Sequence, residues 1–207
     1  MRAAIIFALA GALALSSPSH ADVTAVCPTL TPGVTLHGRY IQEQHLKGLT
    51  APLKTEGDFV VAPNLGIIWR SEQPVRSVTV ITAAGMERIV NGNDIHRLAS
   101  AKIPAFAHMY ELLDRAMMGD WSAMQKDFTL EYTGTRRAWR IILTPLRSAG
   151  PLAARLTSIV MTGDGRIDTV DINRTNGDFE HVAFVNQVVS RAPLDGPDAH
   201  LLHDKWE

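Results

Sequence analysis

Gly57-Asp-Phe-Val-Val-Ala-Pro-Asn-Leu-Gly-Ile-Ile-Trp69 is the stretch that decides the fold, because it places two apolar runs on either side of the dipeptide Pro63-Asn64. Valine, isoleucine, phenylalanine and tryptophan favour strands, whereas proline followed by asparagine favours a tight turn. The stretch therefore predicts two neighbouring strands, over 57–62 and 66–70, joined by a short turn.

Short strand-like segments continue on both sides of this pair. Turn residues interrupt them about every 8 to 12 residues, a spacing typical of antiparallel sheets, meanders and barrel-like shells. Asn91-Gly92, Gly163-Asp164-Gly165 and Asn176-Gly177 are hairpin signals. The further predicted strands are 40–44, 75–82, 86–90, 128–132, 139–143, 156–162, 166–173 and 180–186.

One segment departs from the strand pattern. After Pro104 the apolar residues recur with helical spacing and form a single stripe. Pro104 suits the first turn of a helix and Gly119 suits its end, and a second short helix is predicted over 121–126. The stripe consists of Phe106, Met109, Tyr110, Leu113, Ala116 and Met117.

The amino terminus predicts a cleavable secretory signal. Arg2 precedes an unbroken run of apolar or small residues, and Ser19 and Ala21 fit a small-x-small cleavage site. The run is shorter than the roughly 20 apolar residues that cross a bilayer. We therefore expect residues 1–21 to be a signal peptide, cleavage after Ala21, and a periplasmic location.

The remaining chain, residues 22–207, predicts one domain with its core at about 38–186 and an irregular tail over 187–207. Without Arg2 it holds 19 Lys and Arg against 21 Asp and Glu, a net charge of −2, with no basic stripe for nucleic acid. Cys27 is the only cysteine, which excludes an internal disulfide. Val26 before it does not suit a lipid-attachment site, and the role of this thiol stays open.

Signals for catalysis and metal binding are weak. The eight histidines show no metal-ligand spacing. The chain contains no nucleophile elbow, no zinc-protease motif and no phosphate-binding loop. The sequence predicts no metal, no cofactor and no catalytic residue, although a serine, histidine and aspartate brought together from distant positions stays an open alternative.

The apolar side chains of the predicted strands and helix have two interpretations. These side chains either fill an ordinary core or line a cavity for an apolar ligand, and the flexible methionines favour the cavity. Periodicity does not distinguish the two. The candidate cavity residues are Phe59, Val61, Ile67, Trp69, Val78, Val80, Phe106, Met109, Leu113, Met117, Trp139, Ile141 and Leu143.

The order of several motifs resembles the LolA-type periplasmic outer-membrane lipoprotein carriers over residues 38–186. The quoted stretch is followed by Gln73-Pro74, then by Gly119-Asp120-Trp121 after the predicted helix, and then by Trp139-Arg-Ile-Ile-Leu-Thr-Pro145. Ala62 stands where these carriers have an arginine before the turn. The resemblance implies an α+β fold in which a curved antiparallel half-barrel is covered by a few short helices acting as a lid.

The same resemblance implies a function. A monomeric, non-enzymatic carrier would hold the acyl chains of a lipoprotein or another lipid in its cavity and deliver them towards the outer membrane. Its partners would be an inner-membrane donor complex and an outer-membrane receiver. The alternatives are an envelope hydrolase with a dispersed active site and a non-carrier envelope scaffold module.

Overall fold

The structure, a computed structural model, describes residues 30–92, 94–99, 110–111, 114–116, 120–150, 153–194 and 196–203. The predicted signal segment, Cys27 and the candidate residues Phe106, Met109, Leu113 and Met117 lie outside these ranges. The described residues form mostly one open antiparallel sheet of 11 strands, with a few short helices.

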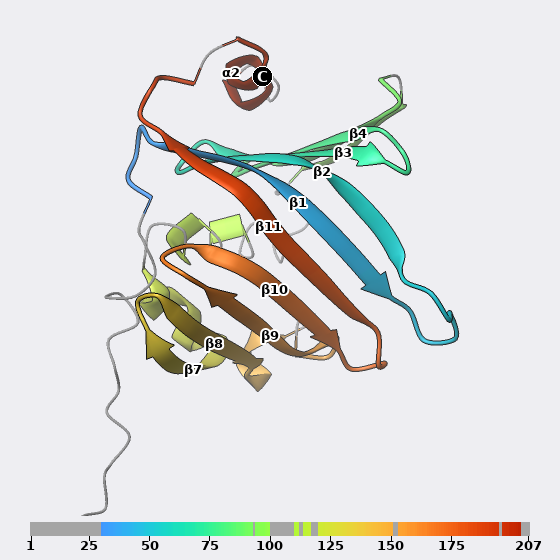
Figure 1. Ribbon diagram of the computed structural model, residues 1–207, viewed down its shortest axis with the longest axis vertical. Helices are drawn as coiled ribbons and strands as arrows, with labels where there is room; N and C mark the ends of the chain where they lie inside the picture. The colour runs from blue at the N-terminus through green and yellow to red at the C-terminus, as the bar shows by residue number, and fades with distance from the viewer. Residues whose placement is uncertain are drawn as a thin grey trace, which may run out of the picture.

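The sheet consists of two meanders joined through its central strands (Figure 1). The order across it is β6-β5-β4-β3-β2-β1-β11-β10-β9-β8-β7. The first meander contains β1 (Thr35–His45), β2 (Leu53–Ala62), β3 (Gly66–Gln73), β4 (Ser77–Thr82), β5 (Gly85–Val90) and β6 (Asp94–Ala99). The second contains β7 (Phe128–Thr135), β8 (Ala138–Pro145), β9 (Leu156–Gly163), β10 (Ile167–Arg174) and β11 (Phe179–Ser190).

The turn predicted at Pro63-Asn64 is confirmed. Val61 pairs with Ile67, and the N–H of Leu65 donates to the carbonyl of Ala62 at 3.0 Å. Asn64 has a φ of 65°, in the left-handed region that asparagine tolerates better than most residues. Local turn chemistry therefore sets the register of β2 and β3.

Asn91-Gly92 also forms the predicted hairpin turn. Both residues have positive φ, 49° and 80°, as a tight hairpin turn between twisted strands requires. The strand that follows, β6, pairs with β5 from Val90 and Asp94 onward. This strand is not predicted from the sequence, because charged residues and histidine alternate with the apolar positions of 94–99.

Pairing of β1 with β11 joins the two ends of the described chain. Tyr40 lies opposite Phe184, and Ile41 lies opposite Ala183. Figure 1 shows these two long strands side by side, with β2, β3 and β4 on one side of them and β10, β9, β8 and β7 on the other. Their pairing turns two meanders into one continuous sheet.

The expectation of an irregular tail over 187–207 is wrong. β11 continues to Ser190, and residues 196–203 form the helix α2 (Gly196–His203). Pro197 suits the first turn of a helix, and Asp198 lies at its positive amino end. A helix this short has little stability of its own, so tertiary contacts must hold it.

Strand alternation gives the sheet two faces, named here the inner and the outer face. Facing residues in a ladder share one face. Trp69 of β3 lies opposite Phe59 of β2, and the same face continues through the β1–β11 pair and the next strands to Ile141 of β8. The inner face therefore extends across both meanders. The outer face carries Val80, opposite Ile68, and is covered by α2, which Figure 1 shows on the far side of β2–β4 from β7–β10.

Two 3-10 turns complete the described structure. The first is η3 (Trp121–Lys126), where the sequence predicts a short helix, and its buried residues pack on the inner face of β7–β9. The second is η4 (Arg147–Ala149), which follows β8. Residues 110–111 and 114–116 are helical, within the longer helix that the apolar stripe predicts.

Candidate functional site

An aromatic cluster occupies the inner face of β1, β2, β3 and β11. The rings of Tyr40 and Trp69 have centroids 4.0 Å apart, and Phe59 meets Phe184 edge to face at 5.2 Å. Gly38 makes room for this packing, because a Cβ there would lie 2.7 Å from the Phe59 ring. Burial raises the pKa of the Tyr40 hydroxyl, which keeps the cluster uncharged.

A second cluster lies on the inner face of β7, β8 and β9. Trp139, Ile141 and Leu143 alternate along β8 and are at most 2% exposed. Gly163 lies opposite Trp139, and a Cβ at Gly163 would lie 2.5 Å from the Trp139 ring, so the missing side chain is what admits the indole. Trp121 of η3 packs onto this cluster from the side facing away from the sheet.

The two clusters are joined by the central strands. Val182 of β11 belongs to the aromatic cluster and pairs with Val170 of β10. Val170 pairs with Met161 and packs against the second cluster. The inner face is therefore an apolar strip that crosses the sheet from β3 to β8.

A short segment covers part of this strip and is named here the cover segment: residues 110–111, 114–116 and 120–126. Ala116 packs against the β7–β9 cluster. At the other end of the strip, the N–H of Asn64 donates to Oδ1 of Asp114 at 3.0 Å. The cover segment therefore contacts both meanders.

The buried polar atoms of this region that have no hydrogen-bond partner within the described structure include the hydroxyl of Tyr110 and the indole nitrogens of Trp121 and Trp139. Leaving such a group unpaired costs about 1–3 kcal/mol. Burial also raises the pKa of Tyr110 to about 12. The apolar strip thus contains donors that its own residues do not satisfy.

The structure places the described candidate residues on two different faces of the sheet. Phe59, Val61, Ile67 and Trp69 lie in the aromatic cluster, and Trp139, Ile141 and Leu143 lie in the second cluster of the same face. Val78 and Val80 lie on the outer face, where they pack with Leu202 of α2. Period-two alternation separates them from Trp69, because Val80 pairs with Ile68 and Val78 pairs with Arg70.

Several inner-face residues are not among the candidates predicted from the sequence. Tyr40 and Phe184 meet only through the β1–β11 pairing, which no local signal specifies. Met161 lies in the strand predicted over 156–162, and period-two alternation of that strand could have identified it as a buried residue. Trp121 falls in a segment predicted as a helix but without a stripe of its own.

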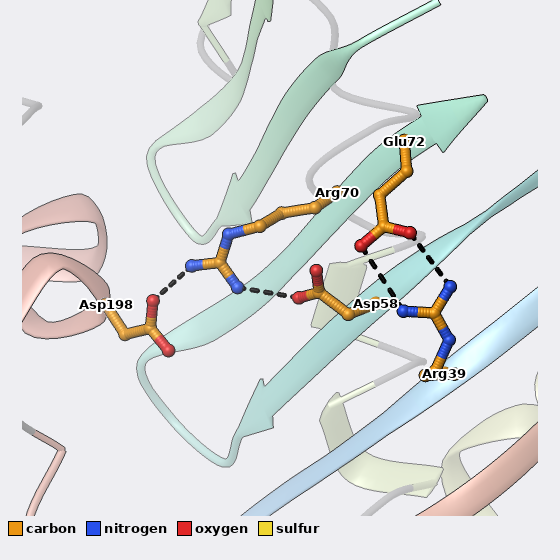
Figure 2. Close-up of polar contacts among 5 residues, drawn as sticks. All are labelled: Arg39, Asp58, Arg70, Glu72 and Asp198. Carbon is orange, nitrogen blue, oxygen red and sulfur yellow. Dashed lines mark hydrogen bonds and ion pairs between the residues drawn. The ribbon is translucent and has the colours of Figure 1, made fainter. Parts of the chain in front are cut away.

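Beside the apolar contacts of α2, the outer face carries a group of ion pairs (Figure 2). Arg70 bridges Asp58, at 2.8 Å, and Asp198 of α2. Arg39 donates two hydrogen bonds to Glu72, which holds the pKa of that carboxyl below its usual range. A depression of about 770 Å³ beside these residues is lined by acidic and basic side chains together with Val78 and Ile89.

The described residues give little support for catalysis or metal binding. Nδ1 of His181 lies 2.5 Å from a carboxylate oxygen of Asp171 on the outer face of β10 and β11. Within the described ranges no serine or cysteine completes this pair. The same ranges contain no group of three or more His, Cys, Asp or Glu residues placed to hold a metal ion.

The fold and the inner face define a class of protein: a large antiparallel sheet with one apolar face under a short helical cover. The family model described as outer membrane lipoprotein carrier protein LolA-like matches residues 15–199. The chain belongs to this family. Within the described ranges no helix is both long and apolar enough to span a membrane.

Three solved structures to which this chain is similar share little sequence with it. A LolA superfamily protein from Nitrosomonas europaea is 8% identical, with 87% of this chain and 94% of that one covered and a TM-score of 0.44. A DUF1329 family protein from Desulfovibrio piger is 10% identical, covering 82% and 90%, with a TM-score of 0.41. A putative outer membrane lipoprotein-sorting protein domain from Vibrio parahaemolyticus is 9% identical, covering 79% and 88%, with a TM-score of 0.37. No curated protein matches the sequence.

Proposed function

We propose that this protein is an exported, non-enzymatic carrier that binds acyl chains on the inner face of its sheet. The sheet acts as a half-barrel and the cover segment acts as its lid. The cargo is a lipoprotein or another acyl-bearing lipid, carried through the periplasm from an inner-membrane donor to an outer-membrane receiver. Membership of the LolA-like family supports this class of function.

The observation that carries the proposal is the continuous apolar strip from Trp69 to Trp139 beneath a cover of limited length. An acyl chain gains about 0.8 kcal/mol for each methylene that it buries. In the closed state Trp121 and Met124 occupy the β7–β9 part of the strip. An incoming chain would replace their contacts with similar ones, so exchange between the closed and the loaded state has a small net cost.

The strip also suits reversible binding. Its clustered side chains are apolar or aromatic, and no covalent step or bound nucleotide is needed to load or release a chain. Release requires only that the receiver offers a more favourable apolar site. We propose that the carrier works as a monomer, with one lid for each sheet.

Native mass spectrometry of protein purified from envelope extract tests the proposal. We expect bound lipid, and we expect the emptied protein to take up a hydrophobic fluorophore. Trp139→Asp should abolish uptake, whereas Thr144→Asp, at an exposed position of the same strand, should not. Recovery of only empty protein that takes up no fluorophore would overturn the proposal.

A second experiment does not depend on a destabilising substitution. A photo-cross-linking amino acid at Leu130, half-buried on the inner face of β7, should attach to the acyl chain of the cargo. The same group at Glu131, the exposed neighbour on the outer face, should not. Equal cross-linking at both positions would place the cargo elsewhere.

A further inference from the structure

The second inner-face cluster contains two buried indole donors from different elements. The indole of Trp121 belongs to the cover segment and that of Trp139 belongs to the sheet. Both are more than nine-tenths buried, at 3% and 2% exposed, and both pack into the same cluster. Neither nitrogen has a hydrogen-bond partner within the described structure.

An unpaired indole N–H is an unusual choice for a purely apolar core. Buried tryptophans usually find a partner for this group, and phenylalanine supplies an aromatic ring without any donor. The two donors therefore indicate that the cluster is completed by an acceptor that the described residues do not provide. Tyr110, whose hydroxyl is also buried and unpaired, adds a third donor in the same cover segment.

The surroundings of the donors limit the chemistry of that acceptor. The side chains packed around the two indoles within the cluster, among them Phe128, Ile141 and Met161, are apolar or aromatic, and the charged side chains near Trp139 line a separate hollow at the end of β8. Burying a carboxylate or a phosphate there would cost far more than two neutral hydrogen bonds return. A neutral carbonyl, such as that of an ester or amide, suits both the donors and the apolar walls.

We propose that the indole N–H groups of Trp121 and Trp139 bind the carbonyl oxygens of ester- or amide-linked acyl chains, so that the site selects such chains over free fatty acids and plain hydrocarbons. The inference rests on the carrier function proposed above and adds the chemical class of its cargo. When the lid opens, the two donors separate with their walls and become available to the incoming linkage. Trp139 acts from the sheet and Trp121 from the lid.

Competition for a bound fluorophore tests this selectivity. The probes are methyl decanoate, undecane and decanoate, which differ in the linkage while their chains stay similar. We expect the wild-type protein to prefer the ester to the hydrocarbon by about tenfold, the equivalent of about 1.4 kcal/mol. Trp121→Phe and Trp139→Phe should each lose most of that preference, measured within each variant as the ratio of its affinities for methyl decanoate and undecane.

Trp69→Phe is the matched control, because it makes the same change on the same face but in the aromatic cluster. We expect it to affect the ester and the hydrocarbon equally. A wild-type protein that binds both probes without preference, or Phe variants that keep the preference, would overturn the inference and leave the carrier function standing. Binding of neither probe would overturn the carrier function itself.

A spectroscopic measurement on the unaltered chain avoids any loss of folding in the variants. The four tryptophans give four indole N–H signals in a nitrogen–proton correlation spectrum. Methyl decanoate should shift the signals of Trp121 and Trp139 in the direction of stronger hydrogen bonding, and undecane should not. Identical shifts with the two probes would contradict the inference.

Discussion

The backbone N–H of Asn64 donates a hydrogen bond to Oδ1 of Asp114 at 3.0 Å, which ties the turn between β2 and β3 to the cover segment. Because the other end of that segment packs on β7–β9, this bond links the two meanders across the inner face. If the cover segment is a lid, the bond between Asn64 and Asp114 must break when the lid opens at this end.

Asp114→Ala should therefore speed loading. A hydrogen bond of this kind contributes about 1 kcal/mol, so we expect uptake of a hydrophobic fluorophore to become about fivefold faster in stopped-flow measurements. Glu111→Ala is the control, because Glu111 is exposed and pairs within the segment with Arg115. Equal uptake rates for the Asp114 variant and the wild type would show that this bond does not hold the lid.

Leu202 should be important for stability but not for loading. It is buried on the outer face against Val60, Ile68 and Val80. We expect Leu202→Ala to lower the free energy of unfolding by about 2–5 kcal/mol in urea titrations, because it leaves a cavity beneath α2. Leu201→Ala, at a partly buried neighbour, should cost less. Loss of lipid binding in a Leu202 variant that is still folded would contradict the separation of the two faces.

Gly163 should not tolerate a side chain. A Cβ there would lie 1.7 Å from the carbonyl oxygen of Arg166 and 2.5 Å from the Trp139 ring. We expect Gly163→Ala to lower the free energy of unfolding by at least about 3 kcal/mol. Gly165→Ala, two residues away, meets nothing within 4 Å and strains only a backbone with φ of 68°, so it should cost about 1–2 kcal/mol. Thermal or urea unfolding measures the stability that each variant loses. Similar losses for Gly163→Ala and Gly165→Ala would show that the contact of Gly163 with Trp139 is not tight.

The hydroxyl of Tyr110 should titrate only near pH 12. Burial raises its pKa to about 12 from an ordinary value of 10.0, because ionisation would place a charge in the apolar region. The neutral hydroxyl is thus favoured in the folded state, and this contribution to stability is lost as the pH rises from about 10 to about 12. Tyr110→Phe should flatten the fall in unfolding free energy over that range. If Tyr110→Phe removed phenolate absorbance that the folded wild-type protein shows near pH 10, the prediction would be contradicted.

Much of the sheet could be predicted because its signals are local. A continuous apolar run specifies β2, and alternation of apolar residues specifies β8. Pro63-Asn64 specifies the turn from β2 to β3 and Asn91-Gly92 the turn from β5 to β6, without help from the rest of the chain. The seven candidate residues from Phe59 to Trp69 and from Trp139 to Leu143 fall on one face for the same reason.

What could not be predicted depends on distant partners. Val80 alternates as regularly as Ile67, but only the register with β3 places it on the outer face, beneath α2. The helix α2 itself has a weak local pattern and is held by the contacts of Leu202 and by the ion pair of Asp198 with Arg70. No rule of local sequence brings these residues together.

The pairing of Tyr40 with Phe184 also has a consequence for how the chain folds. A chain made from its amino terminus presents β1 early and β11 late, and contacts between residues so far apart in sequence form slowly. Until β11 arrives, β1 is an open edge and the apolar inner face cannot be completed. The newly made protein therefore passes through a partly folded, aggregation-prone intermediate. We expect it to depend on a holding chaperone until β11 has been synthesised and can pair with β1.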